Sequence, residues 1–180
     1  MSVPADLLDP EPIYWPRYDP AVVIMGDSRS FLAYDFPFIK NSIYNLGVGN
    51  STTRGIISRL YRLDSIPHKY VFLTTGINDW QIPIEEFFMN LATIAAYINN
   101  IDGICIITEQ GLHPVQATVQ PELVAYGIGM QKIPGSYYLP VGYLPADYID
   151  TIAHFNLSGY NKLANAMIKH FHGHKKVIVS

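Results

Sequence analysis

The sequence predicts an α/β fold in which helices cover a parallel sheet on both faces. Short apolar runs alternate along the chain with segments of helical periodicity, a pattern typical of repeated strand–helix units. The strand-like runs are mostly continuous, as expected for strands buried on both faces. Three of them end in a polar loop that contains glycine. Right-handed crossovers would bring these three loops to one edge of the sheet, where open α/β sheets bind ligands.

Five runs rich in apolar residues are interpreted as strands. The first, third and fourth are continuous, the second alternates polar and apolar residues, and Pro140 weakens the fifth. The strands are expected at residues 21–25, 42–48, 70–74, 104–108 and 136–141.

Helices are predicted from apolar residues that recur every three or four positions. The clearest lies at residues 83–99, where Pro83 suits the first turn and Glu85 and Glu86 suit the positive end of the helix dipole. The others are expected at residues 31–39, 54–63 and 156–171, with a helix start at 121–126 and a loop at 127–135.

Length and composition indicate one folded domain. The chain has 180 residues, of which 49% are hydrophobic and 15% charged. We expect an extended N-terminal arm at residues 1–20, which hold five prolines, and a single domain at residues 21–175. The net charge is −3 and no basic stripe occurs, which argues against nucleic acid as a partner.

No membrane or export segment is expected. No apolar run approaches the ~18 residues of a transmembrane helix, and the N-terminus lacks the pattern of a signal peptide. A different export route, or excision from a longer chain, would leave no trace, so cellular location and oligomeric state stay open.

The cysteine and the C-terminal histidines are not predicted to be functional. Cys105 lies inside an apolar run, where a thiol is usually a small buried hydrophobe. His170, His172 and His174 are interpreted as part of a solvated tail rather than a metal site. No metal ligand set is predicted.

Ser28 is the first candidate for catalysis. It follows the apolar run at residues 21–25 and the turn residues Gly26 and Asp27. A serine at the carboxyl end of a buried parallel strand is placed as a nucleophile would be. The simpler alternative is that Asp27 or Ser28 only caps the following helix.

Other residues could supply the remaining parts of an acyl-transfer site, which needs a base and donors for an oxyanion. Gly49 would let a backbone N–H approach the substrate, and Asn78 carries an amide NH₂. Among six histidines, His154 is the best placed base, because it lies on a loop after the last strand with Asp150 four residues upstream. A solvated loop histidine is the ordinary alternative.

Taken together, these motifs resemble those of the GDSL/SGNH hydrolase superfamily. The four blocks are Gly26-Asp27-Ser28, Gly49 with Asn50, Gly76-Ile77-Asn78-Asp79, and His154 with Asn156, Gly159 and Tyr160. They occur in the order of the family and span most of the chain. Each block alone is common, but the ordered set is specific.

The resemblance implies a fold and a set of roles. The fold would be a three-layer α/β/α fold of flavodoxin-like type with five parallel strands. Ser28 would be the nucleophile and His154 the base. The backbone N–H groups of Ser28 and Gly49, with the side chain of Asn78, would form the oxyanion hole. These roles agree with those assigned from chemistry, and they require no metal or organic cofactor.

The sequence departs from the family pattern at the acid. The family places an aspartate three residues before the histidine, but position 151 is threonine. The acid could be Asp150, which we favour, or Asp147, or Glu109 from another strand end. A Ser-His dyad without an acid is a further alternative.

A milder departure follows the nucleophile. Arg29 stands where the family name has leucine, and it would be either solvated or a contact for an anionic or polyhydroxylated substrate.

The predicted function is a serine ester hydrolase that works through an acyl-enzyme. Its small size and the lack of a lid domain favour short acyl esters, such as O-acetyl groups on carbohydrate. Alternatives are a lysophospholipase, a thioesterase or an acyltransferase of the same superfamily. A catalytically silent carbohydrate-binding module would keep the fold without the reaction. A flavodoxin-like phosphate binder is a poorer match, because the first loop lacks a run of glycines or hydroxyl residues.

Overall fold

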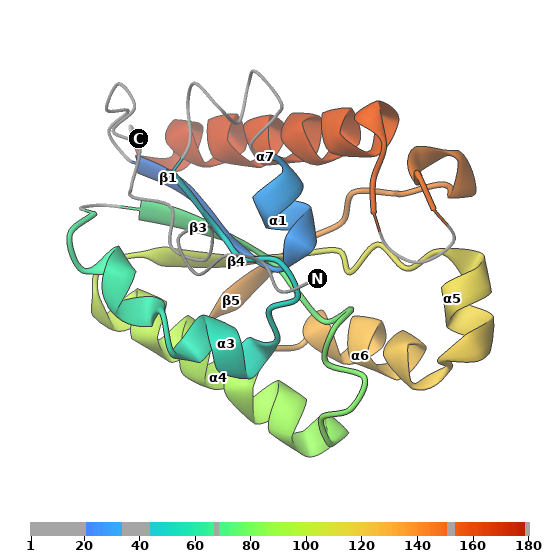
Figure 1. Ribbon diagram of the computed structural model, residues 1–180. Coiled ribbons are helices and arrows are strands. Elements are labelled where there is room, and N and C mark those ends of the chain that lie inside the picture. The colour runs from blue at the N-terminus through green and yellow to red at the C-terminus, as the bar shows by residue number, and fades with distance from the viewer. Residues whose placement is uncertain (1–20, 34–43, 67–68, 151–153, 179–180) are drawn as a thin grey trace.

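The computed structural model describes residues 21–33, 44–66, 69–150 and 154–178, and within them a parallel sheet forms the centre (Figure 1). Its strands are β1 (Ala21–Gly26), β2 (Tyr44–Gly47), β3 (Lys69–Thr74), β4 (Ile104–Thr108) and β5 (Ser136–Leu139). They lie in the order β2-β1-β3-β4-β5, and every pairing is parallel. This is the doubly wound order of flavodoxin-like folds, which confirms the predicted fold class.

Helices cover both faces of this sheet (Figure 1). One face carries α1 (Ser28–Leu32) and α7 (Leu157–Ile178). The other carries α3 (Thr53–Ile57), α4 (Ile84–Asn100) and α6 (Glu122–Met130). The remaining elements are η3 (Leu60–Leu63), α5 (Pro114–Val119) and η4 (Pro145–Asp147).

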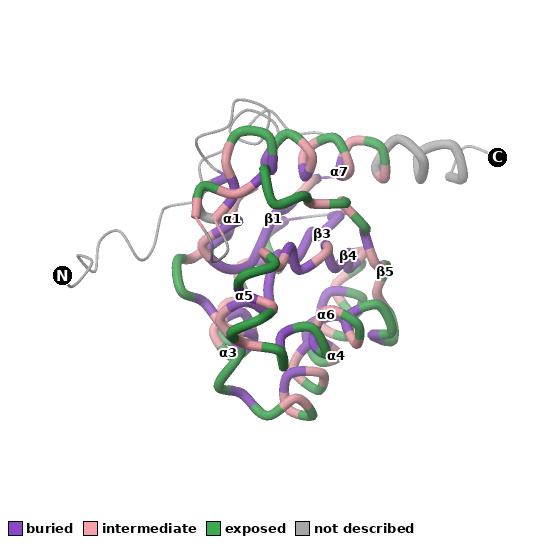
Figure 2. The backbone as a smooth tube through the Cα atoms, turned by 90° about the vertical axis from the view of Figure 1, so that its right-hand side faces the viewer, coloured by how far each residue is buried: buried purple, intermediate pink, exposed green. Residues whose placement is uncertain are grey.

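The alternation of side chains along each strand divides the core into two clusters. In β1, Val23 and Met25 pack on the side of α4, whereas Ile24 packs on the side of α7. In β3, Val71 and Phe72 separate in the same way. Both sides of each central strand are therefore buried (Figure 2), which is why these runs are continuously apolar.

The loop predicted at residues 127–135 is wrong for its first four residues. Residues 127–130, which include Gly127 and Gly129, belong to a helix. The helix α6 runs through Gly127 and Gly129. A Cβ on Gly129 would lie 2.0 Å from the Phe88 ring, and one on Gly127 would lie 2.9 Å from Gln110 Oε1. These glycines permit close packing of α6 against its neighbours. The short helix α5 was not predicted.

Two other expected helices differ in their bounds. The helix expected at residues 54–63 is divided into α3 and η3, with Thr52 as the N-cap of α3. The helix expected at residues 31–39 begins earlier, because α1 starts at Ser28. Residues 34–43, and the arm expected at residues 1–20, lie outside the described residues.

The structure shows the surroundings of Cys105 and of His170, one of the C-terminal histidines. Cys105 is buried in β4, and burial raises the pKa of its thiol to about 12. This agrees with the predicted hydrophobic role. His170 is not in a solvated tail as expected, because it lies within α7 with its ring 6.1 Å from those of Phe72 and Tyr137.

Candidate active site

The turn after β1 places Ser28 at the carboxyl edge of the sheet. The strand ends at Gly26, whose φ is +154°, and α1 begins two residues later. A Cβ on Gly26 would lie 1.9 Å from the Thr74 carbonyl oxygen, so only glycine fits between β1 and β3. The Asp27 amide donates to the same carbonyl at 3.0 Å. Ser28 is thereby held half-buried on a tight strand-to-helix turn.

The structure brings His154 to Ser28. His154 Nε2 lies 3.3 Å from Ser28 Oγ, although the two residues are 126 positions apart. His154 lies on the loop between η4 and α7 and is 39% exposed. A neutral imidazole with a free lone pair on Nε2 could accept the proton of the serine hydroxyl.

Asp150 contacts the other ring nitrogen of this histidine. Asp150 Oδ2 lies 2.6 Å from His154 Nδ1, and Asp150 Oδ1 accepts a hydrogen bond from the His154 amide at 3.2 Å. A carboxylate at Nδ1 favours the tautomer with its proton on Nδ1. That tautomer leaves Nε2 free to accept from Ser28.

The loop that carries Asp150 and His154 is closed at its base by antiparallel contacts. Tyr148 and Phe155 form an isolated antiparallel bridge, and the Ile149 amide donates to the His154 carbonyl at 2.8 Å. The segment before Asp150 and the segment after His154 therefore run antiparallel beside each other. This arrangement brings position 150 against position 154, so an acid four residues before the histidine reaches the imidazole.

Asp147 is engaged elsewhere. Its buried carboxylate lies 2.6 Å from Lys162 Nζ and accepts hydrogen bonds from Ser158 Oγ and from the Leu144 amide. These contacts join η4 to the first turns of α7. Asp147 therefore anchors the start of the loop that carries Asp150 and His154, which we call the histidine loop.

Glu109, the other carboxylate considered, lies at the end of β4. Its Oε2 accepts hydrogen bonds from the amides of Val141 and Gly142, each at 2.7 Å. These bonds hold the segment after β5 against β4. Of the three carboxylates, Asp150 is the one that the structure brings to His154.

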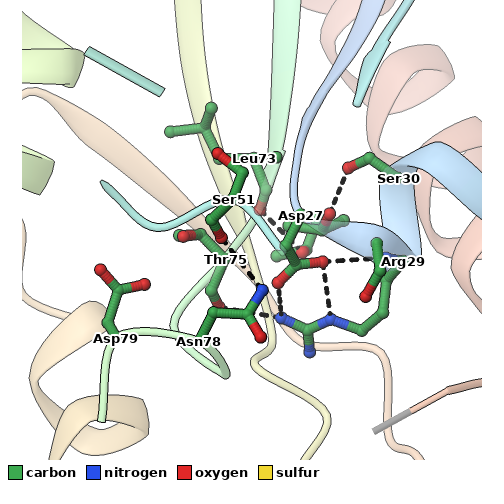
Figure 3. Close-up of polar contacts among 12 residues, drawn as sticks. Asp27, Arg29, Ser30, Ser51, Leu73, Thr75, Asn78 and Asp79 are labelled. Atoms are coloured by element: carbon green, nitrogen blue, oxygen red, sulfur yellow. Dashed lines mark hydrogen bonds and ion pairs between the residues drawn. The ribbon is translucent and has the colours of Figure 1, made fainter. Parts of the chain in front are cut away.

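The loops after β2 and β3 hold the oxyanion candidates. Gly49 is exposed in a turn closed by a bond from the Ser51 amide to the Val48 carbonyl, 3.2 Å long. Asn78 Nδ2 donates to the Ser51 carbonyl at 3.1 Å, which joins the two loops (Figure 3). An amide NH₂ has two hydrogens, so the bond to Ser51 uses only one of those on Asn78.

A buried carboxylate braces these loops. Asp79 Oδ1 accepts hydrogen bonds from the Thr53 amide at 2.8 Å and from Thr53 Oγ1 at 2.7 Å. Burial raises the pKa of Asp79, and the bonds from Thr53 oppose that rise only in part. Because Asp79 follows Asn78 directly, this contact fixes the orientation of the β3 loop against the start of α3.

Arg59 hydrogen-bonds to the end of β1 and to the loop after β2. Both of its terminal nitrogens lie 3.1 Å from Ser51 Oγ, and Nη2 lies 3.4 Å from the Gly26 carbonyl. Burial lowers the pKa of this guanidinium. Arg59 thus connects the end of β1 with the residue whose carbonyl holds Asn78.

Arg29 is neither solvated nor a substrate contact, contrary to both expectations. It is 1% exposed and forms a two-pronged ion pair with Asp27, with Nη2 2.6 Å from Oδ2 and Nε 3.1 Å from Oδ1 (Figure 3). Burial is the largest single influence and would lower the pKa of Arg29, but the charge of Asp27, its hydrogen bonds and two nearby tyrosines together raise that pKa. The Asp27 carboxylate also accepts from the Arg29 amide at 2.9 Å.

The sequence predicted the candidate site residues at the carboxyl edge of the sheet. It did not predict the residues whose hydrogen bonds hold the surrounding loops in place. Thr53, Arg59 and the inward direction of Arg29 were not predicted. The spacing of Asp27 and Arg29 was the one available sign, since a carboxylate and a guanidinium two residues apart can pair across a tight turn.

The part of the chain that the structure describes holds no candidate metal site. They contain no group of three or more His, Cys, Asp or Glu side chains that could hold a metal ion. None of the helices described is long and apolar enough to span a membrane.

Comparison with known proteins shows the fold but not a sequence family. No family model matches the chain, and no curated protein matches it either. Among solved structures, it is similar to a GDSL-like lipase from Bacteroides thetaiotaomicron, with a TM-score of 0.73 and 17% identity over 89% of this chain and 92% of the other.

Two further solved structures resemble the chain. A catalytic mutant of an acetylxylan esterase from Geobacillus stearothermophilus has a TM-score of 0.66 and 14% identity, over 83% of this chain and 93% of the other. The OSK domain of Drosophila Oskar has a TM-score of 0.62 and 13% identity, over 92% and 91%. At such identities the likeness establishes a shared fold, and a fold does not decide the activity.

Proposed function

We propose that this chain, which has the fold of solved GDSL-like lipases and esterases, is a serine ester hydrolase that works through an acyl-enzyme. The observation that carries the proposal is the continuous contact from Ser28 Oγ to His154 Nε2 and from His154 Nδ1 to Asp150. A hydroxyl, an imidazole and a carboxylate in this order are the parts that activate a serine for attack on a carbonyl.

In the first half-reaction, Ser28 Oγ attacks the ester carbonyl while its proton passes to His154 Nε2. The carbonyl oxygen becomes an oxyanion, which the backbone N–H groups of Ser28 and Gly49 and the side chain of Asn78 would stabilise. Asp150 stabilises the imidazolium that forms. The carbon–oxygen bond of the alcohol then breaks, and His154 gives its proton to the leaving oxygen.

In the second half-reaction, water attacks the acyl-enzyme. His154 takes one proton from the water as its oxygen bonds to the acyl carbon, and a second tetrahedral intermediate forms. Its collapse breaks the bond to Ser28 Oγ and returns the proton from His154 to the serine. The acid is released and the site is restored, with no metal or organic cofactor required.

The contact of 3.3 Å between Ser28 Oγ and His154 Nε2 is long for a hydrogen bond between an oxygen and a nitrogen. Catalytic hydrogen bonds in free enzymes are often long and tighten when substrate is bound. The distance is compatible with a shared proton after a small movement of either side chain.

Short acyl esters are the proposed substrates, in particular O-acetyl groups on carbohydrate. The exposed fractions of His154 and Asp150, 39% and 34%, support an open site without a deep acyl channel. The similarity to an acetylxylan esterase points in the same direction. Cleavage of lysophospholipids or thioesters, and acyl transfer to a sugar, remain as outcomes of the test.

The test compares wild type with Ser28→Ala on p-nitrophenyl esters of rising acyl length and on acetylated xylo-oligosaccharides. We expect wild type to exceed Ser28→Ala by at least about 10³-fold in kcat, with the highest kcat/KM on acetyl esters. A fluorophosphonate probe should label wild type at Ser28 and leave the variant unlabelled. Higher rates on long acyl chains would contradict the short-acyl preference.

A silent carbohydrate-binding module is the competing proposal. The unusual position of the acid motivated it, but the closed histidine loop brings Asp150 to the imidazole despite the spacing. Equal rates for wild type and Ser28→Ala on every ester, together with binding of unreacted acetylated oligosaccharide, would favour the module over the hydrolase.

A further inference from the structure

The buried pair of Asp27 and Arg29 stands on either side of the proposed nucleophile. The two side chains are 0% and 1% exposed. Removing two charges from water is costly, and a buried ion pair is weak evidence for stability in itself. The contacts of this pair beside Ser28 therefore indicate what the pair does.

Arg29 contacts more than its ion-pair partner. Its Nη2 donates to the Thr75 carbonyl at 3.1 Å, in the loop that leads from β3 to Asn78. Its guanidinium carbon lies 5.9 Å from the centre of the Phe155 ring, within reach of a cation–π interaction. One side chain thus joins the nucleophile turn, the β3 loop and the residue that follows His154.

Phe155 is itself fixed at the base of the histidine loop. It is 1% exposed, and its ring stacks on that of Tyr143 at 4.3 Å and lies 5.4 Å from that of Tyr148. Tyr148 is also its partner in the antiparallel bridge that closes the loop. A displacement of Phe155 would move the adjacent His154.

We infer that Arg29, held by Asp27, is a positioning residue that sets the distance between Ser28 and His154. The inference rests on the proposed function, since it assigns a role to Arg29 within that reaction. The nucleophile and the base come from loops far apart in the sequence, and Arg29 contacts the supports of both. Its planar fork makes two directed bonds to Asp27, which a lysine could not reproduce.

Arg29 does not bind substrate in this view. With 1% of its side chain exposed, the guanidinium is not presented at the surface of the site. Its loss should therefore lower kcat and leave KM nearly unchanged. Misplacement of a reacting group by about 1 Å can cost about 10²-fold in rate.

The test compares Arg29→Met with the double variant Asp27→Asn/Arg29→Met. The single variant leaves a buried carboxylate without its cation, so its Tm should fall. The double variant leaves no buried charge at positions 27 and 29, and an asparagine at position 27 can still accept from the amide of residue 29. Its Tm should recover toward that of wild type.

Activity should not recover with stability. We expect the double variant to retain a kcat at least about 10-fold below wild type, with KM within about 2-fold. Arg54→Met is the matched control, because Arg54 forms a similar two-pronged pair with Glu86 but is 63% exposed. That control should keep the wild-type kcat and KM.

A crystal structure of the double variant gives a readout that does not need turnover. We expect the separation of Ser28 Oγ and His154 Nε2 to increase beyond hydrogen-bonding distance. Recovery of wild-type kcat together with Tm, a rise in KM alone, or an unchanged separation would each overturn the inference. If wild type is no faster than Ser28→Ala, the proposed function fails, and the separation alone decides the role of Arg29.

Discussion

Asp150 and His154 face each other across a closed loop, with Asp150 Oδ2 2.6 Å from His154 Nδ1. The spacing of four residues differs from that of the family pattern, yet the contact is short. The reason is the antiparallel bridge between Tyr148 and Phe155, which holds the segments that carry Asp150 and His154 beside each other.

Replacing Asp150 with asparagine should lower kcat by about 10²–10⁴-fold. An asparagine cannot stabilise the imidazolium by charge, and its NH₂ can select the wrong tautomer of His154. Steady-state kinetics on p-nitrophenyl acetate measure the effect. Asp147→Asn is the control, because Asp147 pairs with Lys162 rather than with the histidine. Loss of kcat in Asp147→Asn equal to that in Asp150→Asn would contradict the assignment of the acid.

Replacing Asn78 with alanine should lower kcat by about 10²–10³-fold, the usual cost of one oxyanion donor. KM should change little, because the bond strengthens as charge develops on the substrate oxygen. Asn99→Ala is a matched control, since Asn99 also donates from Nδ2 to a backbone carbonyl, that of Gly135, at 2.9 Å. A similar kcat for the two variants would exclude Asn78 from the oxyanion hole.

Alanine should destabilise the protein strongly at Gly26 and hardly at all at Gly49. At Gly26 a Cβ would lie 1.9 Å from the backbone of β3, at a φ of +154°, so we expect a loss of more than about 4 kcal/mol in the free energy of unfolding. At Gly49 a Cβ meets nothing within 4 Å, and stability should change by less than about 0.5 kcal/mol.

The Gly49→Ala variant then reports on the site alone. Its methyl group would crowd the approach of a substrate oxygen to the backbone N–H, so kcat/KM should fall by about 10-fold. Chemical denaturation and kinetics on the same preparation separate the two effects. Unchanged kcat/KM in a normally stable Gly49→Ala protein would remove Gly49 from the proposed oxyanion hole.

Lowering the pH should weaken the ion pair between Asp147 and Lys162. Burial alone would raise the pKa of Asp147, but hydrogen bonds from Lys162, the Leu144 amide and Ser158 lower it below its ordinary value. A carboxylate whose pKa is lower in the folded state adds stability that is complete above its unfolded pKa, about 3.9. That stability is lost as the pH falls through the lower, folded value.

Thermal unfolding from about pH 6 to about pH 2.5 tests this. Relative to wild type, Asp147→Asn should lose about 1–2 kcal/mol near neutral pH and nothing at the acid end, where both proteins lack the charge. Asp102→Asn is the control, because Asp102 is exposed and its φ of 55° is one that asparagine also adopts. A constant difference between Asp147→Asn and wild type at every pH would contradict the prediction.

Much of the fold was predictable because it depends on local patterns. The run at residues 21–25 is apolar on both faces, and the structure places it in the middle of a sheet covered on both sides. The prediction failed at Gly127 and Gly129, since a glycine that breaks a helix and one that permits close packing look alike in sequence. The ring of Phe88 and the side chain of Gln110 distinguish the two cases, and both lie in other elements.

By itself the sequence determined the fold class and marked Ser28, Gly49, Asn78 and His154, because each is a glycine or polar residue beside a recognisable strand or helix end. Only the tertiary structure decided which carboxylate meets His154 and whether Arg29 is solvated. Both depend on contacts between segments distant in the chain: the bridge from Tyr148 to Phe155 turns Asp150 to the imidazole, and Thr75 and Phe155 enclose the guanidinium. Burial and hydrogen bonding of a charged side chain are set by what packs against it, and a local motif does not contain that information.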